Sequence, residues 1–339
     1  NDELTLDLAG FSVINETKRT FYIYGKMSVM DSVGTGTIVG SQAGEAIEGG
    51  VIRVRGGQFD LYGGTVRYNP EAAGAYQGGV IFAQAYQEVA SIVNLYGGIV
   101  EGGKTTDRGG NITVSGSYLT ISGATVQKGT ATSGNSNGGG NIYIVGDGVV
   151  EITGGKVIGG HAANTGGNIL VGTGFLNMYG GEVTGGTAPK RGNDIYVYYS
   201  ASTANISGGK IGNLSINDYT TPVAISGNPV IERLDITAGK LIAPGKFTSG
   251  AKIGVDANGV FTTDLEDTGA YEGILVPYEE GATLYVSGKA LAMRPAINIE
   301  TETRYCDICK ADAEWGAWDG EATHGHFYLT DDVKAESVI

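Results

Sequence analysis

The chain has 339 residues, with 22 basic and 36 acidic side chains, so its formal net charge at neutral pH is −14. This charge argues against nucleic acids and anionic membranes as partners, and no run of about 18 apolar residues is present that could cross a membrane as a helix. Glycine accounts for 59 residues and proline for only 7, without the every-third-residue glycine of collagen, and the apolar share of 41% makes plain disorder a poor fit.

Residues 1–40 contain four short segments in which apolar and polar residues alternate. They are Leu4–Leu8, Phe21–Tyr24, Met27–Met30 and Gly34–Val39. Such alternation predicts strands with one buried face. Nothing ahead of Leu4 in this sequence could cover the first strand, and an uncovered strand edge is open to pairing with another chain. We therefore expect Leu4, Leu6 and Leu8 to take part in assembly.

Residues 41–212 repeat two short phrases. The first phrase, Gly-Gly-Val/Asn-Ile, begins at Gly49, Gly78, Gly109, Gly139 and Gly166, at spacings of 29, 31, 30 and 27 residues, and returns in altered form as Arg191–Ile195. The second phrase occupies Leu61–Val66, Leu95–Val100, Ile121–Val126, Ile152–Val157, Met178–Val183 and Ile206–Ile211. A fixed period of this size, with no helix-forming stretch, predicts an all-β parallel solenoid in which each repeat buries its apolar face against its neighbours.

The alternation within one repeat predicts which side chains face the core. The residues expected to point inward are Ile142, Ile144, Ile152 and Val157. Those expected to point outward are Tyr143, Glu151, Thr153 and Lys156. One repeat cannot bury its apolar face alone, so the fold depends on stacking.

An asparagine follows the paired glycines in several repeats. If it occupies the same corner of each coil, the side-chain amides of Asn111, Asn141, Asn168 and Asn193 form a column of hydrogen bonds. We interpret this column as a structural device rather than a ligand site.

Two outward columns of the repeats contain aromatic side chains. One includes Phe82, Tyr143 and Tyr196, and the other includes Tyr62, Tyr96 and Tyr179. Exposed rings in such a column are suited to stacking against sugars or to docking a partner protein. The alternative is that the aromatic residues only reflect the preference of solvated sheets for large side chains. Ice binding is a third interpretation, but Thr35 and Thr37 form the only regular threonine pair on a predicted strand of the coils.

The connections between strands vary in length and composition. The predicted irregular loops are residues 69–77, 102–108, 129–138 and 185–191, and we expect them to stack on one side of the solenoid. From residue 213 to residue 293 the glycine pairs become rarer while the alternation continues. Residues 1–293 are therefore expected to form the solenoid, and residues 294–339 a linker followed by a distinct small module.

The C-terminal module contains four residues of the types that bind zinc. Cys306 and Cys309 form a Cys-x-x-Cys pair, and His324 and His326 follow it. Four such donors can make a closed tetrahedral site, from which a segment too small for its own core would gain folding free energy. A disulfide between the two cysteines, or two free thiols, are the competing interpretations.

The glycine phrases resemble those of right-handed parallel β-helix proteins, which have three short sheets per coil and include pectate-lyase-like enzymes and bacterial surface proteins. They are also similar to the glycine-rich β-helix repeats of large wall-attached proteins of Gram-positive gut bacteria. The resemblance implies a right-handed, three-sheet β-helix of about ten coils, secreted or attached to the bacterial cell surface, with adhesin-like properties.

The tail resembles the junctions between β-helices in those surface proteins. There, a Cys/His knuckle and a Trp-x-Ala-Trp phrase precede a Tyr-Leu-Thr-x-Asp-Val strand that opens the next β-helix. The matching residues here are Phe327, Tyr328, Leu329 and Val333. The resemblance implies that the tail of one copy caps the first coil of another, either as a covalent tandem repeat or as a separate subunit adding a strand.

These observations favour an extracellular structural protein that forms a head-to-tail fibre and presents lateral stripes to glycans or surface proteins. The alternative is a polysaccharide lyase or glycoside hydrolase of the pectate-lyase-like fold. That alternative lacks a clear catalytic group, because Asp60, Glu151 and Glu182 are predicted on separate coils and His161 has no evident partner.

Overall fold

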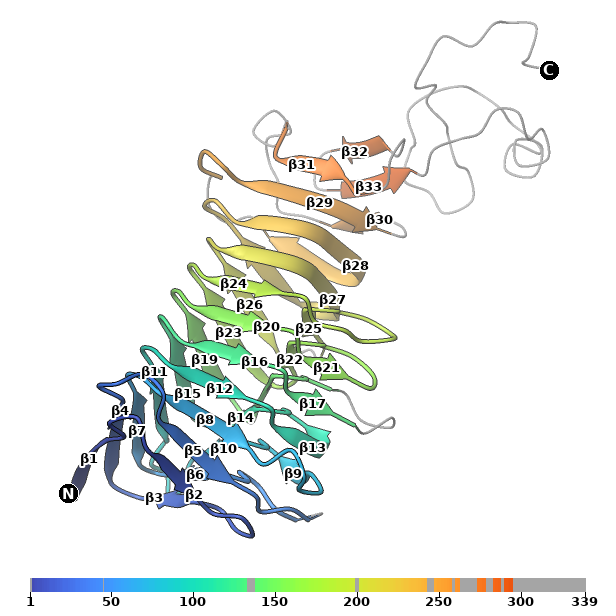
Figure 1. Cartoon of the computed structure of the whole chain (residues 1–339). Helices are drawn as coiled ribbons and strands as arrows, with labels where there is room; N and C mark the ends of the chain where they lie inside the picture. Colours follow the sequence, from blue (N-terminus) through green and yellow to red (C-terminus); the bar gives the residue numbers. More distant parts are fainter. Residues whose placement is uncertain are drawn as a thin grey trace, which may run out of the picture.

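The computed structural model describes residues 2–44, 46–132, 138–198, 201–242, 247–257, 260–262, 273–278, 283–287 and 290–294. Over these residues the chain consists of strands and turns without a helix. The strands stack along one direction, with the N-terminal strands at one end of the stack and the last described strands at the other (Figure 1). The architecture is a parallel β-solenoid, as the repeats predict.

Each coil contributes one strand to each of three ladders, which we call faces A, B and C. Face A contains β1 (Glu3–Asp7), β4 (Lys26–Met30), β7 (Gln58–Leu61), β11 (Ile92–Leu95), β15 (Tyr118–Ile121), β19 (Gly148–Ile152), β23 (Gly174–Met178) and β26 (Thr203–Ile206). Face B contains β2 (Ser12–Ile14), β5 (Thr37–Gly40), β8 (Thr65–Tyr68), β12 (Ile99–Glu101), β16 (Thr125–Gln127), β20 (Lys156–Ile158) and β24 (Glu182–Thr184). Face C contains β3 (Phe21–Ile23), β6 (Ile52–Arg55), β10 (Ile81–Gln84), β14 (Ile112–Ser115), β18 (Ile142–Val145), β22 (Ile169–Val171) and β25 (Ile195–Val197).

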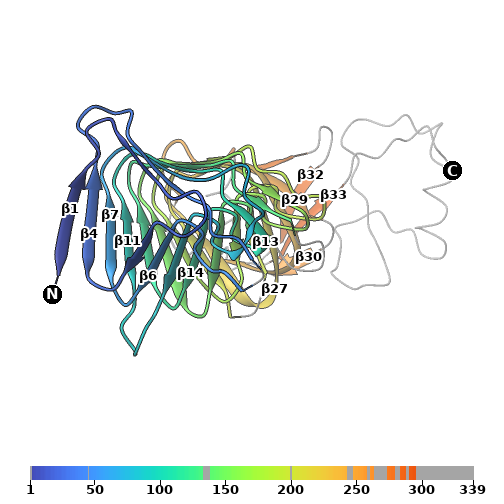
Figure 2. The same ribbon diagram turned by 60° about the horizontal axis from the view of Figure 1, so that its bottom comes forward.

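The later strands continue the same ladders, and the first two of them are much longer than the earlier strands. They are β27 (Lys210–Ile225), β28 (Val230–Ile242), β29 (Lys252–Ala257) and β31 (Leu275–Pro277). β27 pairs in parallel with β24, β25 and β26, so one continuous strand runs across all three faces. Figure 2 shows the parallel order of face A, in which β1, β4, β7 and β11 lie side by side.

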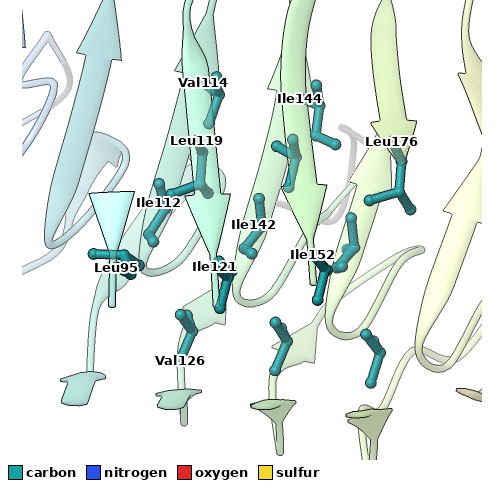
Figure 3. Close-up of a cluster of buried hydrophobic side chains, with 14 of the residues drawn as sticks. Leu95, Ile112, Val114, Leu119, Ile121, Val126, Ile142, Ile144, Ile152 and Leu176 are labelled. Atoms are coloured by element: carbon teal, nitrogen blue, oxygen red, sulfur yellow. The ribbon is translucent and has the colours of Figure 1, made fainter. Parts of the chain in front are cut away.

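The core is a set of aliphatic columns that run through the stack. Each inward residue lies against its counterpart one coil later, as Ile112, Ile142 and Ile169 do on face C. These side chains are fully buried, and so are Ile144, Ile152 and Val157, which confirms the inward positions expected from the alternation. Figure 3 shows the columns from faces A and C meeting in the interior. Burial of each aliphatic side chain contributes about 1.5–3 kcal/mol, and the repeat spreads this contribution evenly along the rod.

The paired glycines of the first phrase are required by close approach between coils. A Cβ at Gly140 would collide with the backbone carbonyl of Gly167 in the next coil. The preceding Gly139 has φ +72°, in the left-handed region that favours glycine. The phrase therefore marks a corner where the chain turns tightly and the neighbouring coil leaves no space for a side chain.

The structure differs from the sequence-based expectation at three places. Three of the predicted irregular loops contribute strands to a fourth, parallel ladder: β9 (Ala75–Gln77), β13 (Lys104–Arg108) and β17 (Thr130–Ala131). The ladder also includes β21 (His161–Ala162), which lies outside those loops. β2 was not among the predicted strands. At the far end, β30 (Val260–Thr262), β32 (Thr283–Ser287) and β33 (Ala290–Arg294) form an antiparallel sheet rather than further parallel coils.

Candidate functional site

The first coil leaves three strand edges open. Among the residues that the structure describes, β1, β2 and β3 each pair with one strand only, namely β4, β5 and β6. In a parallel ladder, a strand that pairs on one side presents backbone N–H and C=O groups on the other. These unpaired edges, together with Leu4, Leu6, Val13 and Phe21, are called the open end below.

The apolar columns of the core run to the open end without a cover among the described residues. Leu4 is the register partner of Met27, yet Leu4 is 52% exposed and Met27 is 4% exposed. Leu6, Val13 and Phe21 pack on the core but are only partly buried. The open end therefore presents the same apolar side chains that every later coil covers with its neighbour.

Leu8 does not belong to this surface. It is 4% exposed and lies within the main core cluster, because the chain turns inward after β1 and places its side chain against the second coil. Its backbone N–H donates to the carbonyl of Met30 in that coil. The expectation that Leu8 offers an assembly contact is wrong, whereas Leu4 and Leu6 do lie at the open end.

The aromatic column on face C is outward but covered. Phe82, Tyr143 and Tyr196 lie in register on β10, β18 and β25, as expected. Each of them is 3% exposed, however, so the expectation of an exposed stripe is wrong for these three residues. Tyr143 and Tyr196 form a second apolar cluster with Leu170, apart from the main core.

Arginine side chains and neighbouring rings explain this burial. The guanidinium of Arg53 lies 5.5 Å from the ring centroid of Phe82, and that of Arg108 lies 5.1 Å from the ring of Tyr143. Arg108 Nη1 also donates a hydrogen bond of 2.8 Å to the Tyr143 hydroxyl. Burial raises the pKa of Tyr143, against the opposing effect of Arg108. Alternation predicted that these rings leave the core but could not predict what lies over them.

The second aromatic column is exposed, as expected. Tyr62, Tyr96 and Tyr179 follow the ends of face A strands and are 51%, 45% and 54% exposed. The rings of Tyr62 and Tyr96 stack with centroids 4.8 Å apart, which matches one coil of the ladder. The exposure of these three residues agrees with the expectation, and their role in binding stays a prediction.

The asparagine column is present but ends on a different residue from the one expected. Asn111 donates to Asn141 at 2.6 Å, and Asn141 donates to Asn168 at 2.7 Å. Asn168 then donates to Asp194 rather than to Asn193. In the last repeat Gly192, Asn193 and Asp194 take the places of Gly166, Gly167 and Asn168, so Ile195 keeps the register of Ile169 and Asp194 occupies the asparagine position. Asn193 is exposed.

The candidate carboxylates do not form a pair. Asp60 and Glu151 occupy the same outward column of face A, separated by three strand spacings or about 14 Å. Asp60 is buried and accepts hydrogen bonds from Gln58 and Asn94. Glu182 lies on face B in an ion pair with Lys156 at 3.3 Å. Two carboxyl groups that cleave a glycosidic bond stand about 5–9.5 Å apart, so Asp60 and Glu151 are too far apart for that role.

The sequence also offers His161 and a set of possible metal ligands as candidate site residues. His161 lies on β21, where its Nδ1 is 2.9 Å from the hydroxyl of Thr187. Within the described ranges, no group of three or more histidine, cysteine, aspartate or glutamate residues is arranged to hold a metal ion. The predicted zinc ligands Cys306, Cys309, His324 and His326 lie outside those ranges, as do the predicted assembly residues Phe327, Tyr328, Leu329 and Val333.

The comparisons with known proteins assign this chain to no family, so its class is defined by its fold alone. No family model, no curated protein and no solved structure matches it. In the part of the chain that the structure covers, no helix has the length and apolar character to cross a membrane. Over its described residues, the chain is thus a parallel β-solenoid whose first coil has unpaired strand edges and whose face A carries an exposed aromatic column.

Proposed function

We propose that this chain is an extracellular, adhesin-like structural protein of the bacterial cell surface that assembles head to tail into a fibre. The observation that supports this most strongly is the open end, where the core columns finish in exposed Leu4 beside unpaired strand edges. An added strand would bury these side chains and satisfy the backbone groups of β1 at the same time. A contact of this kind extends the solenoid without changing its geometry.

The partner in this proposal is the C-terminal tail of another copy. Its segment from Phe327 to Val333 has strand-forming apolar residues and would supply the missing first strand. β33 ends at Arg294, at the opposite end of the stack from β1 (Figure 1), and residues 295–339 continue the chain from there. Each copy then offers one open end and one capping tail, which is the heterologous arrangement that generates open filaments.

Structural zinc in the tail is part of the same proposal. The four donors Cys306, Cys309, His324 and His326 would fold the module that presents the capping strand. Loss of the metal would then weaken assembly while the solenoid itself stays folded.

Light scattering coupled to size-exclusion chromatography tests the assembly. The full chain is expected to show a molar mass that rises with concentration through multiples of the monomer. Leu4→Lys should restore the monomer, because it places a charge in the contact, and its exposure in the single copy lets the fold tolerate the change. Tyr118→Lys is the matched control, since Tyr118 is equally exposed but lies on β15, several coils away from the open end. A monomer at every concentration would refute the proposal.

A further inference from the structure

Face A carries three outward columns between β7 and β26. The residues of the first column are Gln58, Ile92, Tyr118, Val149, Phe175 and Thr203. Those of the central column are Asp60, Asn94, Thr120, Glu151, Asn177 and Asn205. The third column contains Tyr62, Tyr96, Ser122, Thr153, Tyr179 and Ser207, each at the turn that follows its strand.

Rings stand on both sides of the polar central column. Tyr118 and Phe175 are exposed on one side, and Tyr96 and Tyr179 on the other. Phe175 lies on β23 and Tyr179 directly follows that strand, so the two rings bracket Asn177 at about 13 Å, the span of four strand residues. Tyr118 and Phe175 lie two coils apart, or about 9.6 Å, which suits two sugar units of an extended chain.

The central column has hydrogen-bonding capacity that the protein itself does not use. Among the described residues, the side chains of Thr120 and Glu151 have no hydrogen-bond or ion-pair partner. Asn205 donates to Asn177 at 2.9 Å, which leaves the Asn177 amide N–H groups and the Asn205 carbonyl oxygen for another partner. All four side chains are at least partly exposed, so a ligand can reach them. By contrast, Asp60 and Asn94 are bonded to each other at 2.7 Å.

The charge of this face selects among ligands. The three columns from β7 to β26 contain two carboxylates, Asp60 and Glu151, and no lysine or arginine. An acidic polymer would be repelled by these carboxylates and by the net charge of −14 on the chain. The three columns offer it no basic side chain to pair with. Flat apolar sugar faces and their hydroxyl groups instead match the exposed rings and the unpaired amides.

We propose that the outer face of face A binds an uncharged polysaccharide, which lies along the rod over the central column and stacks on Tyr118, Phe175, Tyr96 and Tyr179. This inference deepens the proposed extracellular role by naming the ligand class and the face that takes it. It does not require assembly, because every contact comes from one copy.

Affinity electrophoresis in native gels tests the proposal with defined probes: glucomannan and hydroxyethyl cellulose as uncharged polymers, and polygalacturonate as an acidic one. The full chain should be retarded by at least one uncharged polymer and not by polygalacturonate. Tyr118→Ala combined with Phe175→Ala should weaken the retardation roughly tenfold or more, as expected for the loss of about 1.4 kcal/mol or more. Both side chains point away from the core, so the fold should persist.

Two controls separate stacking from structural damage. Tyr118→Phe keeps the ring and should bind like the wild type, and Tyr278→Ala removes an exposed ring elsewhere on the rod and should have no effect. Retardation by polygalacturonate alone, equal retardation of the double variant, or no retardation by any uncharged polymer would overturn the proposal. The last outcome would favour a protein partner for this face. A variant that loses glycan binding but still assembles, or the reverse, shows which of the two proposals has failed.

Discussion

Asn168 donates its side-chain amide to the carboxylate of Asp194 at 2.7 Å, and this bond closes the asparagine column of the solenoid. The column ends there because the next coil presents an amide donor, the backbone N–H of Asn213, which lies 2.8 Å from the other carboxylate oxygen. An asparagine in place of Asp194 has only one oxygen, so it could not accept both bonds. Its N–H₂ group would face either the N–H of Asn213 or the amide donor of Asn168. Burial raises the pKa of Asp194, while the N–H groups of Gly186, Asn213 and Asn168 oppose that rise.

Replacing Asn141 tests the column. The Asn141 amide donates to Ile158 and Asn168, and its oxygen accepts from Gly129 and Asn111. Asn141→Ala removes all four bonds. The oxygen of Asn168 keeps the bond from Gly160 and the carbonyl of Ile158 keeps the bond from Lys128, but the Gly129 N–H and one N–H of Asn111 are left without a partner. We therefore expect the free energy of unfolding to fall by at least about 2 kcal/mol.

Chemical denaturation measures the loss, and Asn193→Ala is the control. Asn193 precedes the column position and is exposed, so its replacement should change the free energy of unfolding by less than about 0.5 kcal/mol. Similar losses in both variants would contradict the register described here.

Acid should loosen the corner that joins the first two coils. Asp7 accepts hydrogen bonds from the backbone N–H groups of Ser32 and Ala9, both at 2.9 Å, and these lower its pKa. Because the folded pKa lies below the unfolded value, the stabilisation is present above the unfolded pKa and is lost as the pH falls through the folded pKa. The wild type should exceed Asp7→Asn in stability at about pH 6, and the difference should vanish near about pH 2.

Thermal unfolding followed by circular dichroism across this pH range measures the difference. Asp7→Asn keeps an oxygen that can accept the same bonds but cannot titrate, so the other acidic groups cancel in the comparison. A gap between the two proteins that stays constant with pH would show that the charge of Asp7 has no role.

Gly140 should be intolerant of any side chain. A Cβ there would meet the carbonyl oxygen of Gly167, so Gly140→Ala is expected to lower the free energy of unfolding by about 2–3 kcal/mol. Gly63→Ala is the matched control, because the nearest atom to its added Cβ would be the backbone nitrogen of Asp31 at 3.4 Å. Equal stability of the two variants would mean that the coils can separate at the glycine corner.

Metal analysis tests the tail. The full chain purified with zinc present should retain about one zinc ion per chain, and Cys306→Ser should abolish its binding. His161→Ala is the control, since His161 lies on the solenoid and outside the proposed ligand set. A zinc-free chain whose two cysteines can be alkylated only after treatment with a reductant would establish the disulfide instead.

Much of the solenoid could be predicted from its repeats. The spacing of the glycine phrases set the coil length, and the alternation identified the core columns to which Ile142 and Ile152 belong. A two-residue strand such as β17 has no period to detect, so the fourth ladder could not be found in this way. The antiparallel sheet at the far end lacked a signal as well, since its strands alternate in the same manner as the parallel ones.

The candidate site was predicted less completely, for a physical reason. Alternation separates core-facing from outward residues, but the burial of Tyr143 depends on Arg108 from the preceding coil, which no local pattern reveals. The sequence analysis misplaced the end of the asparagine column because it matched Gly192 to the second glycine of the phrase instead of the first. Alignment on Ile195, whose inward position the core enforces, would have identified Asp194. The polar column of face A had a signal in Asn94, Thr120 and Asn177, which share one outward position.

Cross-linking of a mixture of normal and heavy-isotope copies tests head-to-tail assembly most directly. Lys26 lies on β4 beside the open end, where it pairs with Glu3 at 2.7 Å, and Lys334 directly follows the proposed capping strand. The proposed fibre predicts cross-links from Lys26 of a normal copy to Lys334 of a heavy copy, detected by mass spectrometry. Links between these lysines only within chains of one isotopic form, or no link between them, would contradict it.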